Sequence, residues 1–150
     1  MHLNLFSLAG LILSITCFVV VILVLIYGKK NLHRAWTLFN IAVGLWGLGA
    51  FYIGQATNEE LALIEWRFAH IGIIFISVFI FHVAYLLCNL QKKYLLIFAY
   101  VQGILFSALG FSGNFFISGV RSVFSLFYYL TPGITYPIFC FEHIKPPNLS

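Results

Sequence analysis

Residues 5–34 read LFSLAGLILSITCFVVVILVLIYGKKNLHR, and this stretch decides the fold class. It begins with an uncharged apolar run from Leu5 to Tyr27 and ends with a short basic segment. A helix of about 20 apolar residues crosses a hydrocarbon core of ~30 Å. The run is longer than the about 7–15 residues of a signal-peptide core, and no Lys or Arg precedes Leu3. We therefore expect a retained membrane-spanning helix.

The rest of the chain has the same apolar character. Of its 150 residues 62% are hydrophobic and 8% are charged, and the mean hydropathy is +1.02. A soluble domain carries about 25% charged residues. Three further apolar runs, at 35–54, 61–89 and 94–111, are each long enough to span a bilayer. The sequence predicts an all-α membrane protein, a multi-pass helical bundle with the lipid bilayer as its main partner.

The charged residues alternate between the loops that join these runs. Five of the eight lysines and arginines lie in the first and third loops, and the second loop is acidic; the five are Lys29, Lys30, Arg34, Lys92 and Lys93. Basic loops stay in the cytoplasm, so the N-terminus is expected outside. Trp36, Tyr52 and Trp66 near the helix ends are predicted to be interfacial aromatics. The net charge of +4 in short loops indicates orientation and gives no sign of a nucleic-acid partner.

Beyond residue 111 the pattern changes. Hydropathy alone allows one helix over 122–141, but Pro132, Gly133 and Pro137 would disturb it. We favour an outer-leaflet segment, extended in conformation, that leads to a partial fifth helix near Tyr136. Residues 142–150 form a short polar tail broken by prolines. The expected organisation is therefore four full transmembrane helices and a partial or broken fifth within residues 1–141, as if the chain were cut short.

Polar side chains at membrane depth mark the third apolar run as the candidate site. An ionisable group in the bilayer is costly unless it is paired or hydrated, so it suggests function. The candidate signal-sensing residues are Trp66, Arg67 and His70 near the outer interface and His82 and Tyr85 deeper, with Asn89 at i+7 from His82 on the same face. The alternative is that these groups only form interhelical hydrogen bonds or reach the head-group layer.

Small residues mark the expected helix contacts. They let two backbones approach closely inside a bilayer. The second run carries Gly44, Gly47, Ala50 and Gly54, and the fourth carries Gly103, Ser107 and Gly110. Asn40 and Gln102, each within a helix, are expected to form interhelical hydrogen bonds.

The chain offers little for catalysis or for a cofactor. Three cysteines, Cys17, Cys88 and Cys140, have no CxxC spacing, which argues against a disulfide framework or a zinc site. A transmembrane haem would need a facing histidine at mid-depth, and His2, His33 and His143 are terminal or in loops. No nucleotide, hydrolase or metalloprotease motif occurs. We expect no enzymatic activity, cofactor or metal.

Three segments carry a resemblance to a known family. Residues 31–49, NLHRAWTLFNIAVGLWGLG, resemble its second helix, and residues 65–72, EWRFAHIG, with His82 further on, resemble the start of its third. Gly119 and Val120, with residues 131–139, TPGITYPIF, are similar to the outer segment before its fifth helix. The family is the N-terminal seven-transmembrane sensory region of bacterial histidine kinases, which also precedes some diguanylate cyclases.

This resemblance implies a membrane sensory input module for signal transduction in a two-component system. It implies a multi-pass protein of the bacterial inner membrane, whose family architecture adds further helices, a dimeric linker and a kinase or cyclase part. We expect a truncated sensor that assembles as a homo-oligomer or with a full-length sensor kinase. The alternative is a small transporter or channel subunit, with His82, Tyr85 and Asn89 lining a path in an oligomer.

Overall fold

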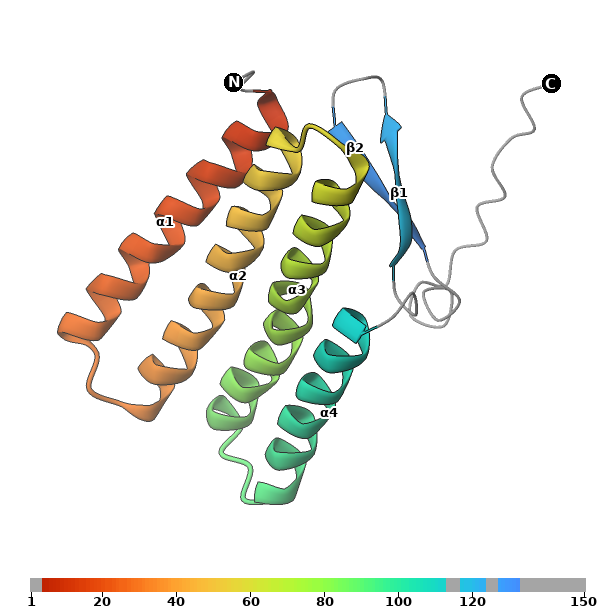
Figure 1. The fold of residues 1–150 in the computed structure, drawn as a ribbon. Helices are drawn as coiled ribbons and strands as arrows, with labels where there is room; N and C mark the ends of the chain where they lie inside the picture. Colours follow the sequence, from red (N-terminus) through yellow and green to blue (C-terminus); the bar gives the residue numbers. More distant parts are fainter. Residues whose placement is uncertain (1–3, 113–116, 124–126, 133–150) are drawn as a thin grey trace.

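Four long helices and a β-hairpin make up the structure, a computed structural model that describes residues 4–112, 117–123 and 127–132. In chain order the elements are α1 (Leu5–Tyr27), α2 (Asn31–Gln55), α3 (Glu59–Leu87), α4 (Lys93–Ser112), β1 (Ile117–Val123) and β2 (Phe127–Pro132). The helices run up and down side by side (Figure 1). The described part is mostly helical, and all four helices are long and apolar enough to cross a membrane.

Two helices begin earlier than the sequence predicts because side chains cap their first turns. The second helix begins at Asn31 instead of residue 35, and the His33 Nδ1 accepts a hydrogen bond of 3.2 Å from the Lys30 N–H. Asn58 is the N-cap of α3, and its side-chain oxygen accepts the Leu61 N–H at 2.8 Å. Since α2 takes in residues 31–34, the first basic loop shortens to residues 28–30.

The third helix ends at Leu87, two residues before the predicted end at Asn89. Asn89 has a φ of 49°, in the left-handed region that asparagine tolerates better than most residues. It therefore lies in the turn between α3 and α4. The prediction that Asn89 shares a helix face with His82 and Tyr85 is wrong for this reason.

The first two helices pack along a seam of small residues. Ser7, Gly10, Ser14, Cys17 and Val21 are the buried residues of α1, and their spacing of three and four is the pattern of left-handed helix pairs. Two glycines, Gly10 and Gly47, face each other across this seam. A Cβ added to Gly47 would lie 2.9 Å from the Gly10 carbonyl oxygen and 3.0 Å from the Ser14 nitrogen, so only glycine fits there.

Hydrogen bonds tie the start of α1 to the end of α2. The Ser7 hydroxyl donates to the Phe51 carbonyl at 3.2 Å and accepts from Gln55 Nε2 at 3.1 Å. The Asn4 side-chain amide donates to the Gly54 carbonyl at 3.1 Å. Because interhelical hydrogen bonds contribute to association within a bilayer, this cluster holds the two helix ends together.

A two-stranded antiparallel hairpin stands beside the helices, so the chain is not all-α as predicted. Its register pairs Gly119 with Thr131, Val120 with Leu130 and Arg121 with Tyr129. The extended conformation expected after residue 111 is present, and the alternative helix over 122–141 is wrong for its described residues. The partial fifth helix predicted near Tyr136 and the polar tail at 142–150 lie outside the described residues.

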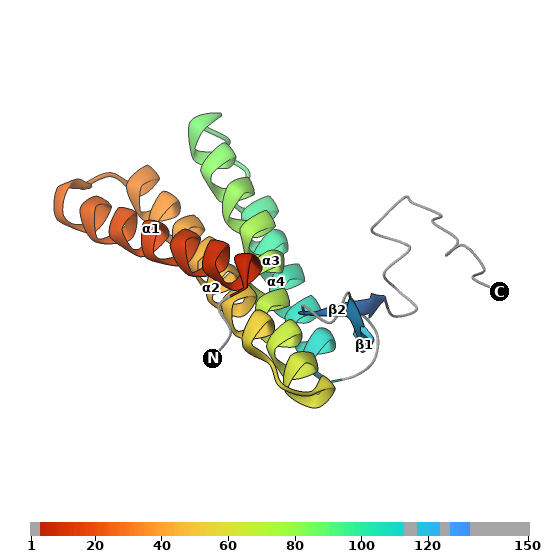
Figure 2. The ribbon, with the colours of Figure 1, turned by 90° about the horizontal axis from the view of Figure 1, so that it is seen from above.

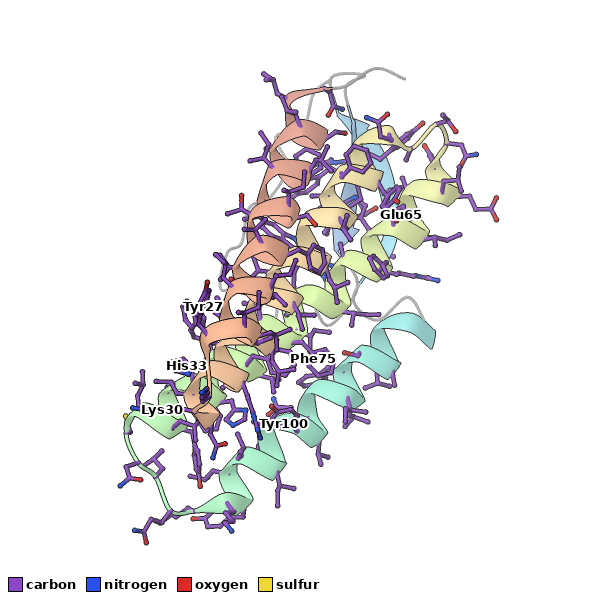
Figure 3. The ribbon with its side chains drawn as sticks, turned by 90° about the vertical axis from the view of Figure 1, so that its left-hand side faces the viewer. Tyr27, Lys30, His33, Glu65, Phe75 and Tyr100 are labelled. Atoms are coloured by element: carbon purple, nitrogen blue, oxygen red, sulfur yellow. The ribbon has the colours of Figure 1, made fainter. Side chains whose placement is uncertain are left out.

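The bundle has two different ends, which we name by what lies there. The hairpin end contains Asn4, the loop 56–58 and the β-hairpin, and the basic end contains the loops 28–30 and 88–92. Seen from above, the α1–α2 pair diverges from the α3–α4 pair, so the two basic loops lie apart (Figure 2). Glu65 lies at the opposite end of the molecule from Lys30 (Figure 3). The acidic and basic ends are thus separated along the bundle.

Candidate functional site

Trp66 fastens the β-hairpin to the helices. Its indole Nε1–H donates to the Tyr128 carbonyl at 2.8 Å, and its ring meets Tyr129 edge-on with centroids 6.0 Å apart. Trp66 is only 9% exposed, so it is packed inside the protein; its place at the depth of the bilayer interface stays a prediction. Burial of the indole is possible because its one polar group has a backbone acceptor.

A small apolar core surrounds this contact. It joins both strands to α2 and α3 and consists of Ile53, Trp66, Ala69, Ile117 and Leu130, with Phe6, Leu63 and Val120 packed around it. Ile53, Ala69 and Ile117 are at most 1% exposed. The hairpin is therefore packed on the bundle as an integral part of its core.

His70 and Arg67 flank Trp66 on α3. His70 is 9% exposed, and its Nδ1–H donates to the Trp66 carbonyl one turn earlier at 3.3 Å. The Nε of Arg67 is buried. Trp66, Arg67 and His70 thus lie together in the first half of α3, the half to which Trp66 attaches the hairpin.

His82 lies further along α3, where this helix contacts α4. Its Nδ1 shares a hydrogen bond of 2.8 Å with the Tyr100 hydroxyl, and the two rings meet edge-on at 5.8 Å. Phe79 packs against the same tyrosine with ring centroids 5.9 Å apart. Figure 3 shows Tyr100 on α4 on the side that faces α3. Sequence reasoning missed Tyr100 as the partner.

The five candidate sensing residues therefore fall into two groups along α3. His70 and His82 are twelve positions apart, which on an α-helix is ~18 Å along the axis and about 120° around it. Trp66, Arg67 and His70 gather at the hairpin end, and His82 contacts α4. Tyr85 is buried, with 7% of its surface exposed. The structure brings together the first three residues and separates them from the last two.

The predicted packing residues face neighbouring helices. An added Cβ on Gly44 would touch Cys17 and Phe18 of α1 at 3.4 Å, and one on Gly54 would strike the Ser7 hydroxyl. Ala50 is buried. On α4, a Cβ on Gly103 would lie 2.7 Å from Val78 of α3, and the Ser107 Oγ is buried with no hydrogen-bond partner among the described residues.

Among the described residues, the two polar side chains expected to join helices form no hydrogen bond to another helix of the same chain. Asn40 donates to the carbonyl of Trp36 in its own helix at 2.8 Å, a local bond that the prediction did not consider. Gln102 is exposed on α4 and has no hydrogen bond within the described part of the chain.

The basic end carries a shallow open cavity of about 280 Å³. Its lining is Leu23, Val24, Tyr27, Gly28 and His33, at the turn from α1 to α2. Tyr27, Lys30 and His33 lie close together there (Figure 3). Within the ranges that the structure covers, no three His, Cys, Asp or Glu side chains gather as metal ligands. Cys17 is a buried free thiol and Cys88 an exposed one.

Comparisons with known proteins add nothing to this geometry. No protein-family model, no curated protein and no solved structure matches the chain.

Proposed function

We propose that this chain is a membrane-embedded sensory input module, in which the hairpin end receives a signal and the basic end passes it on. The observation that carries the proposal is the hydrogen bond from Trp66 to Tyr128, which fixes a non-helical element to a helix that reaches the opposite end of the bundle. The resemblance to the seven-transmembrane region of sensor histidine kinases supports the same function.

The proposed route of the signal follows α3. This helix has 29 residues, or ~43 Å at 1.5 Å per residue, and it begins beside the hairpin and ends at the loop 88–92. A packed helix moves as one body, so a shift of the hairpin displaces its far end as well. The bond between His82 and Tyr100 then carries the movement to α4.

In this proposal the protein spans the inner membrane of a bacterium, with the hairpin end outside. The lysines of the loops 28–30 and 88–92 support a cytoplasmic basic end, because basic loops tend to stay in the cytoplasm. The signal is a lipophilic ligand or a property of the bilayer, and the receiving partner is a cytoplasmic kinase or cyclase part. The alternative function, a small transporter or channel subunit (a conduit), loses support. One of the three residues expected to line its path, Asn89, lies in a turn and not on the helix face.

The test perturbs the hairpin end and measures the basic end. An environment-sensitive fluorophore on the exposed Cys88, with Cys17 replaced by Ala and Cys140 by Ser, reports the end of α3 in lipid nanodiscs. Trp66→Phe keeps a ring but removes the N–H donor to Tyr128, so we expect the emission of the fluorophore to shift. The matched control is Trp36→Phe, because Trp36 lies in α2 on the basic side and is 41% exposed.

Two outcomes would overturn the proposal. One is unchanged emission in Trp66→Phe while amide exchange shows that the hairpin has been released. The other is a selective ion or solute flux through vesicles containing the wild-type protein, which would establish the conduit instead.

A further inference from the structure

The exposed side of α4 carries a regular seam with one polar residue at its centre. Leu95, Phe98, Gln102, Leu105 and Leu109 follow one another at steps of three and four, the spacing at which residues line one stripe of a helix that pairs with another. Phe98 is 67% exposed, Leu105 55% and Leu109 37%. This seam lies about 120° around α4 from Gly103, the residue that packs on Val78 of α3.

Gln102 stands at the middle of a helix that is apolar enough to cross a bilayer. It is the tenth residue of the 20-residue α4, so it lies ~14 Å from each end. With α4 across the membrane, that depth is the centre of a ~30 Å hydrocarbon core. A carboxamide has two N–H donors and a carbonyl acceptor, none of which lipid can satisfy. The described residues of this chain supply no partner for it.

We infer that α4 pairs with α4 of a second copy of this chain through this seam, with the two Gln102 side chains hydrogen-bonded to each other. A carboxamide is self-complementary, because the N–H of one copy meets the carbonyl of the other in both directions. A two-fold axis that runs along the membrane normal between the two α4 helices places identical residues opposite each other, as a symmetric dimer requires. The leucines and Phe98 on either side supply apolar contact, and the central amide sets the register.

This inference rests on α4 alone and holds whether the chain is a sensor or a conduit. A second copy is favoured over lipid because lipid leaves the amide without a partner. It is favoured over the other helices of the same copy because α4 packs on α3 through its opposite flank, at Gly103 and Tyr100.

The first test measures the monomer–dimer equilibrium in vesicles over a range of protein-to-lipid ratios, by single-molecule photobleaching. We expect Gln102→Leu to weaken dimerisation by about tenfold, since interhelical hydrogen bonds in bilayers are modest individually and two are lost here. Gln102→Asn should retain most of the dimer. The matched control is Ile104→Leu, at an exposed position on the other flank of α4, which should leave the equilibrium unchanged.

The second test maps the seam by disulfide trapping between copies, after the native cysteines have been replaced. Single cysteines at positions 98, 102 and 105 should cross-link, and those at 97, 101 and 104 should not. A protein that is monomeric at every lipid ratio overturns the inference. An unchanged monomer–dimer equilibrium in Gln102→Leu also overturns it. Equal cross-linking at both sets of positions overturns it as well, and would indicate that the copies meet through a different surface or that other helices cover α4.

Discussion

Adding one methyl group at Gly47 should force α1 away from α2. An added Cβ would lie 2.9 Å from the Gly10 oxygen and 3.0 Å from the Ser14 nitrogen, whereas ordinary contacts lie at 3.4–4 Å. The opposing atoms belong to the backbone, so no side chain can rotate away. The helices must therefore separate by about half an ångström, and overpacking of this kind costs about 1–3 kcal/mol.

Gly44→Ala is the matched control for Gly47→Ala. It lies one turn away on the same helix, and its Cβ would only touch Cys17 and Phe18 at 3.4 Å. Both substitutions change the intrinsic helix propensity equally, by about 1 kcal/mol in favour of alanine. The difference between the two variants therefore isolates the packing at the Gly10–Gly47 crossing, and we expect Gly47→Ala to be the less stable by about 1–3 kcal/mol.

Reversible unfolding in mixed micelles with a rising fraction of dodecyl sulfate measures this difference. Cys17 is 7% exposed in the folded protein, so a saturating pulse of a small thiol reagent counts the unfolded molecules once Cys88 and Cys140 have been replaced by serine. Equal midpoints for Gly47→Ala and Gly44→Ala would refute the reasoning, because the close approach would then carry no energetic cost.

Three further predictions use the same structure. His82→Ala should cost about 0.6–2 kcal/mol and leave the membrane level intact, and a double-mutant cycle with Tyr100→Phe should show that the two losses are not additive, because both remove one bond. Ser7→Ala should destabilise the protein by a similar ~1–2 kcal/mol in the same unfolding assay, since its hydroxyl both donates and accepts between α1 and α2. Reporter fusions after Lys93 should report cytoplasm and fusions after Asn58 the outside; an inverted pattern would contradict the proposed orientation.

The sequence predicted the helices well because spanning a bilayer is a local property. An apolar run such as Leu5–Tyr27 prefers lipid wherever its neighbours lie, and backbone hydrogen bonds within the run make it helical. The ends were less accurate, by as many as four residues at Asn31, because they depend on single side-chain caps. The break in the helical pattern after residue 111 was also readable, from glycine, serine and proline.

Only the tertiary structure decided what each polar or small residue contacts. Trp66 donates a hydrogen bond to Tyr128, 62 positions further along the chain, and the residue pattern within α3 does not predict this partner. Sequence reasoning placed His82 on a face with Asn89 and missed its bond to Tyr100. Hydropathy along α1 also does not show which of its residues are buried, a set that begins at Ser7.

The physical reason is the range of the forces involved. The free energy of transfer into lipid depends on each segment separately, so the hydropathy and charge of a segment predict whether it can span a bilayer. Pairing of helices has no hydrophobic drive inside a bilayer and depends on close fit and on single hydrogen bonds, which involve residues far apart in the chain. The four helices of the described residues can therefore be predicted from the sequence. The attachment of the hairpin to Trp66 and the exposure of Gln102 are seen only in the packed structure.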